Sequence, residues 1–325
     1  MKKHYLVILA AALFCLALCG CGVKKEDVVN RIFEEKADSF RCDMDTDLDV
    51  TMGMGGMSLD MGMGGRCSFD IDTADPAATA IHAVVNFTAS AMGSTNAVRG
   101  ESYVVTEDGQ ARTYVTDFNT GEWSVSTADT AGQTTLDEAT RQRVKDELKN
   151  VLMQADMDSK TQTVGSEECY ELKLDTDAAV FNNLVDVLWD AVDSSTRAKL
   201  REQGFEITSV KSFLPYLHID ATVYASKDSG RIVEMDVDLS KTDTAALLAE
   251  AMKSAAPMAR AMGVDLSQIK LTLTKTEFSF RFSDYNNVKV EVPEDVREAA
   301  EGGAEEEETE AEEEETEAEE EEYAD

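Results

Sequence analysis

Basic side chains are scarce in this sequence, and their scarcity limits the partners that the protein can have. The 325 residues include 30 Lys or Arg against 65 Asp or Glu, which gives a formal net charge of −35. Proteins bind nucleic acids by neutralising phosphates with Lys and Arg, and a carboxylate excess of this size repels a polyanion instead. The composition therefore argues against nucleic acid as a partner.

Histidine is scarcer still, with His82 and His218 as the only two beyond residue 20. Neither belongs to a pattern such as HExxH or a nucleophile elbow, although catalysis needs a positioned nucleophile, a base and a stabilising group. His82 alternates with apolar neighbours, which is typical of an ordinary histidine in a strand. The sequence therefore predicts a protein that is not an enzyme and has no cofactor.

Long apolar runs are also missing after the N-terminus. No segment beyond residue 20 reaches 18 consecutive apolar residues, so we expect no second membrane anchor. Hydrophobic residues still make up 43 % of the chain, which is enough to build a core. This content excludes a chain that is disordered throughout.

The N-terminus carries the strongest functional signal. Two lysines precede an apolar run of 14 residues, Tyr5–Leu18, which is too short to cross a ~30 Å hydrocarbon core and is typical of a signal peptide. The run ends in Leu18-Cys19-Gly20-Cys21, with an aliphatic residue at −3 and a small one at −1 of Cys21. This pattern predicts a lipoprotein signal peptide over residues 1–20 and a diacylglycerol on Cys21. The mature protein is then held by lipid at the extracytoplasmic face of the cell membrane.

The last 25 residues differ from the rest in composition. Residues 301–325 contain 16 Asp or Glu and no Lys or Arg, and they repeat the unit Glu-Glu-Glu-Glu-Thr-Glu-Ala. Like charges at this density repel one another, so we expect a disordered acidic tail after a single domain over residues 21–300. The tail either keeps the protein soluble or attracts cationic partners or divalent ions.

Two early segments alternate between apolar and polar residues, which predicts a hairpin. In 42–52 the apolar residues take the even positions and aspartates the odd ones, whereas in 57–67 the apolar residues take the odd positions. A turn at Met54 and Gly55 makes both apolar faces coincide. The same register sets Cys42 opposite Cys67 and predicts a disulfide, with two small buried hydrophobes as the alternative.

The apolar face of this hairpin is the candidate ligand site. Methionine adapts its shape to irregular surfaces, which suits variable acyl chains. A loosely packed hairpin without a ligand explains the same residues, and clustered thioethers are also ligands for Cu(I). The candidate ligand-binding residues are Met44, Leu48, Val50, Met52, Met57, Leu59 and Met61.

The remaining patterns indicate an α+β domain, in which many antiparallel strands are interrupted by helices. A short amphipathic helix is expected first, at 26–37. Further helices are expected from near 135 and at 178–192, 195–203 and 244–262. Further strands are expected at 79–91, 97–106, 111–118, 122–127, 169–175, 217–225, 231–239, 269–282 and 288–292.

Short motifs follow one another in a particular order between residues 26 and 295. They are a hairpin from Tyr114 to Trp123, then Cys169-Tyr170-Glu171-Leu172, then Asp228-Ser229-Gly230-Arg231, and finally Phe282-Ser283-Asp284-Tyr285-Asn286 before Val292-Pro293. With the lipidated cysteine and short helix in front, this order resembles the LolA/LppX-like lipoprotein superfamily. The resemblance implies a curved antiparallel half-barrel, with helices on its concave face around an apolar cavity. It also implies a role in carrying acyl chains or lipids.

The sequence therefore leaves three functions open, which we rank from the most to the least favoured. We expect first a non-catalytic lipoprotein that binds an acyl chain, a lipid or another apolar ligand. The second is a surface interaction or structural lipoprotein with a filled core, in which Phe181, Leu184 and Leu188 pack onto the sheet. The third is a methionine-rich metal-binding lipoprotein.

The lipidation site can be tested directly. Replacing Cys21 by Ala should abolish labelling with a clickable fatty acid and stop processing by the lipoprotein pathway. Cys19→Ala is the matched control and should keep the label, because Leu18 in the −1 position of Cys19 is too large for the peptidase. Label that persists in Cys21→Ala would contradict the assignment.

Overall fold

The computed structural model describes residues 23–302 except 35–36, 55, 76–77, 108, 130–137, 193, 203–205 and 262–268. The predicted signal peptide, Cys21 and most of the predicted acidic tail therefore lie outside the described residues. So does the expected start of a helix near residue 135.

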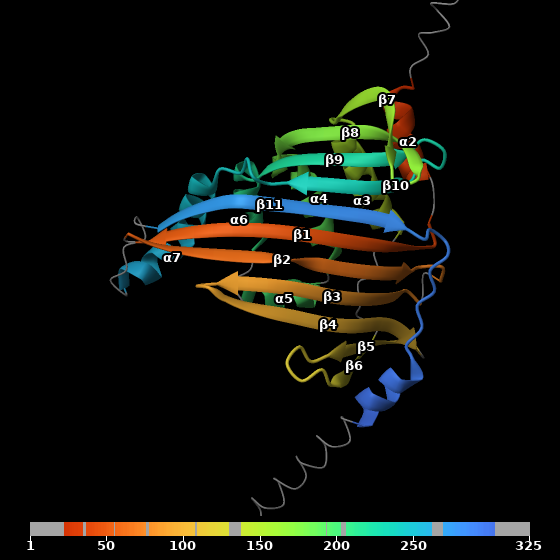
Figure 1. Cartoon of the computed structure of the whole chain (residues 1–325), viewed down its shortest axis with the longest axis horizontal. Coiled ribbons are helices and arrows are strands. Elements are labelled where there is room, and N and C mark those ends of the chain that lie inside the picture. The colour runs from red at the N-terminus through yellow and green to blue at the C-terminus, as the bar shows by residue number, and fades with distance from the viewer. Residues whose placement is uncertain are drawn as a thin grey trace, which may run out of the picture.

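Eleven strands form one open antiparallel sheet in the described part of the chain (Figure 1). Their spatial order is β6-β5-β4-β3-β2-β1-β11-β10-β9-β8-β7, so the first and last strands along the chain meet in the middle. The strands are β1 Ser39–Met54, β2 Met57–Asp72, β3 Ala80–Ala91, β4 Ser94–Glu107, β5 Gln110–Thr116, β6 Trp123–Asp129, β7 Asp156–Val164, β8 Glu167–Asp177, β9 His218–Ser226, β10 Ile232–Asp238 and β11 Ile269–Ser283.

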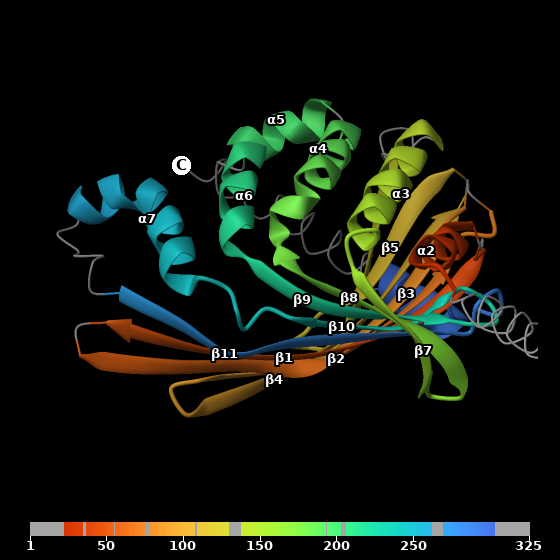
Figure 2. The same ribbon diagram turned by 90° about the horizontal axis from the view of Figure 1, so that it is seen from above.

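The labelled helices lie on one side of this curved sheet (Figure 2). They also contact one another: α3 packs on α2 and α4, α4 on α6, and α6 on α7, which also packs on β11. The α+β half-barrel expected from the sequence is thus confirmed. The helices are α2 Lys25–Glu34, α3 Glu138–Leu152, α4 Asn182–Ala191, α5 Ser194–Glu202, α6 Ile207–Phe213 and α7 Thr244–Ala261, with short 3-10 turns at Ala178–Phe181 and Leu214–Tyr216.

The larger hydrophobic core lies at the β8–β10 end of this helix-bearing face. Val28 and Val29 of α2 and Val151 of α3 pack there against alternate residues of the strands, because alternate side chains of a strand share a face. Arg31 fixes α2 in place by donating hydrogen bonds to the carbonyls of Lys227 and Asp228. The buried strand residues are Tyr170, Leu172, Leu174, Ala221, Val223 and Ala225.

A second core lies on the opposite face of the sheet. Residues 288–292, expected as a strand, instead run as an extended segment into a helix over 294–302. Val292, Val296 and Ala300 pack there against Tyr103 and Tyr114. Arg297 forms an ion pair with Glu107 and lies 5.6 Å from the centre of the Tyr114 ring. The prediction of a closing strand is wrong: Val290 and Val292, whose alternation suggested it, pack in this second core with the helix that follows.

The turn between β1 and β2 lies one residue further along than expected, which shifts the pairing register of the two strands by two residues. Met54 pairs with Met57, so residues 55 and 56 connect the strands. Gly56 has a φ of +90°, a conformation that glycine adopts without strain. In the expected turn, Met54 would have needed a positive φ, which is strained for methionine. A shift of two residues keeps every side chain on its face, so the apolar faces still coincide, but each directly opposed pair changes.

Gly65 lies where three strands approach closely. It pairs with Thr46 on one side and Phe87 on the other. A Cβ at this position would lie 2.2 Å from the Asn86 carbonyl oxygen, whereas a Cβ on the adjacent Gly64 would meet its nearest neighbour at 3.6 Å. A side chain can therefore be added at Gly64 but not at Gly65 without moving the backbone.

Gly65→Ala should therefore destabilise the protein by about 1–3 kcal/mol, the usual range for overpacking a closely packed site. Gly64→Ala is the matched control and should leave the stability unchanged or raise it slightly, because alanine restricts the unfolded chain. Urea denaturation of both variants measures the difference. Equal stabilities of the two variants would contradict the close packing at Gly65.

Candidate functional site

The seven candidate ligand residues lie on the helix-bearing face of β1 and β2. Met44 pairs with Phe280 of β11, which pairs in turn with Met235 beside the larger core, so this face is continuous with the helix-packed face. Three phenylalanines of β11 extend the surface. We call the set the apolar row: Phe40, Met44, Leu48, Val50, Met52, Met57, Leu59, Met61, Phe278, Phe280 and Phe282.

The apolar row has no charged member, although the strands that carry it, β1, β2 and β11, contain many charged residues. The carboxylates of β1 point to the other face, where Asp45 pairs with Arg66 at 2.8 Å and with Arg281 at 3.2 Å. Sequence reasoning did not include Phe278, Phe280 and Phe282 in the site. Their alternation with Ser279 and Arg281 is the signal that could have found them.

The apolar row is only half-buried, in contrast to the larger core. Leu172 and Ala225 in that core are fully buried, whereas Met44, Leu48 and Met61 keep part of their surface accessible. Met57 at the turn is 70 % exposed. The helices that lie over this face of the sheet (Figure 2) therefore leave this stretch partly accessible.

A hollow lies at each end of the apolar row. Near the turn, a hollow of about 520 Å³ is lined by Met52, Met57, Leu59 and Met92. At the other end, a hollow of about 160 Å³ lies beside α2 and is lined in part by Phe40 and Phe282. The stretch of β1 from Phe40 to Met52 spans roughly 40 Å at the usual rise of a strand.

The predicted disulfide between Cys42 and Cys67 is wrong. Cys42 lies opposite Phe69 and Cys67 opposite Met44, because the register is shifted by two residues. Both are free and buried, as is Cys169 on β8. Burial raises the pKa of the Cys42 and Cys67 thiols, and burial together with nearby Glu167 and Glu234 raises the pKa of Cys169 to about 11. These residues are therefore inert members of the core.

A hollow of about 1010 Å³, larger than the two at the ends of the apolar row, lies on the face opposite the labelled helices. Carboxylates dominate its lining, and several are paired with cations from neighbouring strands: Lys275 binds Asp47, and Arg66 binds Asp45. Ion pairs of this exposed kind contribute little stability individually. The carboxylates that line the hollow are Asp45, Asp47, Asp220, Asp236, Asp238 and Glu277.

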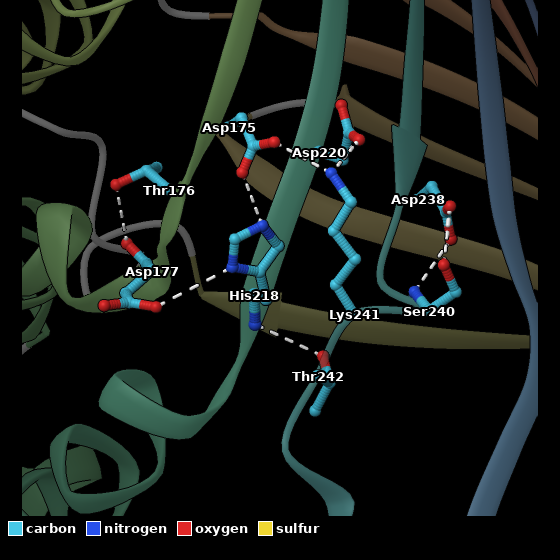
Figure 3. Close-up of polar contacts among 9 residues, drawn as sticks. All are labelled: Asp175, Thr176, Asp177, His218, Asp220, Asp238, Ser240, Lys241 and Thr242. Atoms are coloured by element: carbon cyan, nitrogen blue, oxygen red, sulfur yellow. Dashed lines mark hydrogen bonds and ion pairs between the residues drawn. The ribbon is translucent and has the colours of Figure 1, made fainter.

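His218 lies at the edge of this hollow in a network of charged groups (Figure 3). Its Nε2 is 2.6 Å from Asp175 Oδ1, and its backbone N–H donates to Thr242 Oγ1. Lys241 Nζ donates to Asp175 at 2.8 Å and to Asp220 at 2.7 Å, and this ammonium, with His218, holds the pKa of Asp175 below its usual range. The network joins the ends of β8 and β9 to the segment between β10 and α7.

His82 lies in a comparable network on the same face. Its ring stacks on Tyr103 with centres 4.3 Å apart, and its Nε2 is 2.9 Å from Glu101 Oε1. Asp70 Oδ2 is 3.4 Å from Nδ1, and the two hydrogen bonds from Arg41 are the main cause that lowers the pKa of Asp70. Carboxylates surround both imidazoles, an arrangement suited to holding strands together.

Two further observations concern metals and membranes. Among the described residues, no group of three or more His, Cys, Asp or Glu side chains is arranged to hold a metal ion. Within the same residues, no helix has the length and apolar character needed to cross a membrane.

Comparisons with known proteins give only distant neighbours. The sequence matches no family model and aligns with none of the curated proteins. The crystal structure of LprF from Mycobacterium bovis aligns over 83 % of this chain and 95 % of its own, with 10 % identity and a TM-score of 0.38. A DUF1329 family protein from Desulfovibrio piger aligns over 83 % and 93 %, with 9 % identity and a TM-score of 0.24. On its own architecture, one open antiparallel sheet with α2 to α7 on one face, the chain is consistent with a LolA/LppX-like lipoprotein fold.

The buried thiols give a testable consequence. At pH 8, a cysteine with a pKa of about 11 is about one part in a thousand thiolate, so Cys169 in the folded protein should react very slowly with a thiol reagent. Its reaction should speed up as the pH rises toward 11. After unfolding, Cys42, Cys67 and Cys169 should all react rapidly. A Cys42–Cys67 bond in a non-reducing peptide map would contradict the register.

Proposed function

We propose that this protein is a lipid-anchored lipoprotein of the extracytoplasmic membrane face that binds an acyl chain or another apolar ligand along the apolar row, without catalysis. The observation that carries the proposal is the half-burial of an uncharged row of methionine, leucine, valine and phenylalanine side chains beneath helices. Apolar side chains at the centre of a sheet are normally sealed from water. A surface left accessible under a cover is typical of a ligand site.

The energetics of such a site are favourable. Burying one methylene group gains ~0.8 kcal/mol, so ten methylenes gain roughly 8 kcal/mol before the costs of ordering are subtracted. A dissociation constant of about 1 μM corresponds to a net gain of about 8 kcal/mol, so an acyl chain that binds this tightly must bury more than ten methylenes. Flexible methionines at the turn end can adapt to chains of different shape.

Two features favour a ligand-binding protein over an interaction protein with a filled core and over an enzyme. Of the three residues expected to fill the core, Phe181 packs against the larger core but Leu188 is 43 % exposed, which disfavours a sheet face filled by all three. The two networks around His82 and His218 contain carboxylates and cations that bind one another, which favours a structural role over a catalytic one.

A charge within the apolar row should weaken binding. Leu48→Asp and Met61→Asp should each lower the affinity for a fluorescent fatty acid at least tenfold, because binding would leave the carboxylate desolvated. Thr272→Asp is the matched control, since Thr272 is exposed on the opposite face of β11, and its affinity should equal that of the wild type. The assay uses the mature chain, residues 21–325, with Cys21 replaced by Ser.

Circular dichroism and thermal unfolding establish that each variant is folded before its affinity is compared. A folded wild-type protein that binds no fatty acid at micromolar concentrations would contradict the proposed function and favour the interaction protein. An equal loss of affinity in Thr272→Asp would show that binding does not take place along the apolar row.

A further inference from the structure

The small hollow beside α2 combines an apolar lining with one cation. Ile32 of α2, Phe40 of β1 and Phe282 of β11 line it, together with Arg231, Ile232 and Tyr285. The rings of Phe40 and Phe282 lie 6.3 Å apart, and those of Phe40 and Tyr285 lie 6.1 Å apart. Because Phe40 and Phe282 also belong to the apolar row, the hollow is one end of that row.

Arg231 forms no ion pair among the described residues, and unlike Arg31 and Arg99, whose guanidiniums donate to oxygen acceptors, its buried Nε has no acceptor there. Arg41, Arg66 and Arg281 each form an ion pair with at least one carboxylate. The guanidinium of Arg231 instead lies 4.9 Å from the centre of the Tyr285 ring, and its Nε is buried without a hydrogen-bond partner. The cation–π contact stabilises the charge in part but supplies no acceptor for the buried N–H.

A buried donor without an acceptor is costly, and a guanidinium next to an apolar hollow is a strong attractor for an oxyanion. Tyr285 is not available as that acceptor, because its hydroxyl donates to the carbonyl of Ile232. A ligand oxygen in the hollow would satisfy the arginine. The adjacent rings would at the same time contact the apolar part of the same ligand.

We propose that Arg231 binds the anionic end of the ligand, a carboxylate or a phosphate ester, while the apolar part continues along Phe40 and Phe282 into the apolar row. This inference rests on the proposed function and narrows it to anionic amphiphiles. The volume of about 160 Å³ corresponds to roughly five water molecules at ~30 Å³ each. The hollow therefore has room for a head group and the first methylenes, and the rest of the chain lies in the row.

The position of the hollow along the chain agrees with a ligand that comes from the membrane. α2 begins at Lys25, four residues after the predicted lipidated Cys21, and its ten residues are about 15 Å long. Arg31 holds α2 against the turn before Arg231, where Gly230 with a φ of +77° allows the close approach. The anchor thus keeps the hollow within reach of lipid head groups.

The test compares two ligands that differ only at the head. Palmitate and hexadecanol are each titrated against the mature chain with Cys21→Ser, at pH 8, in competition with a fluorescent fatty alcohol. The wild type should bind palmitate about ten- to a hundredfold more tightly than hexadecanol, in keeping with a charge-assisted hydrogen bond. Arg231→Met should lose this preference and keep the affinity for hexadecanol.

Arg66→Met is the matched control, because Arg66 lies on the opposite face, and it should retain the preference for palmitate. If the wild type binds both ligands equally, or if Arg231→Met keeps the preference, the role of Arg231 is refuted while lipid binding stands. If the wild type binds neither ligand, the proposed function fails. Inorganic phosphate is the third ligand. If the wild type binds phosphate but neither lipid, and Arg231→Met does not bind phosphate, Arg231 belongs to a site for a free anion. This result would refute the proposal that Arg231 binds a lipid head group.

Discussion

The two-sided character of β1 is the constraint on which the rest of the structure depends. This strand is paired along both edges, with aspartates on one face and apolar side chains on the other. A slip of one residue would bury the carboxylates and expose the apolar side chains, so the register is strongly specified. Arg66 from β2 and Lys275 from β11 neutralise part of the acidic face. The same arrangement leaves an uncharged surface beneath the helices, where the proposed ligand lies.

The alternation of apolar and polar residues in β1 and β2 could be recognised in the sequence, because successive side chains of any strand point to opposite faces. It correctly predicted the strands of the first hairpin and the shared face of the candidate ligand residues. The turn was harder to locate, because registers that differ by two residues produce the same faces. The prediction of a disulfide was wrong for this reason. It depended on which residue lies opposite Cys42, and not only on the face that Cys42 occupies.

Other features depend on contacts between segments far apart in the sequence. The helix over 294–302 was not expected, and its place on the opposite face depends on contacts with Tyr103 and Tyr114 of distant strands. Arg231 belongs by sequence to a hairpin, and its lack of a carboxylate partner among the described residues emerges only when β10, β11 and α2 come together. Propensities describe local preference, whereas a missing partner is a tertiary property.

The central claim is that the apolar row is occupied by a lipid when the protein is at work. Native mass spectrometry of the mature protein, purified gently from its own membrane, tests this claim most directly. We expect a folded population with a non-covalent adduct whose mass and fragments identify an acyl-chain compound, in addition to the covalent diacylglycerol proposed for Cys21. A folded protein that carries only its covalent anchor, and that gains no adduct on incubation with lipid, would contradict the account.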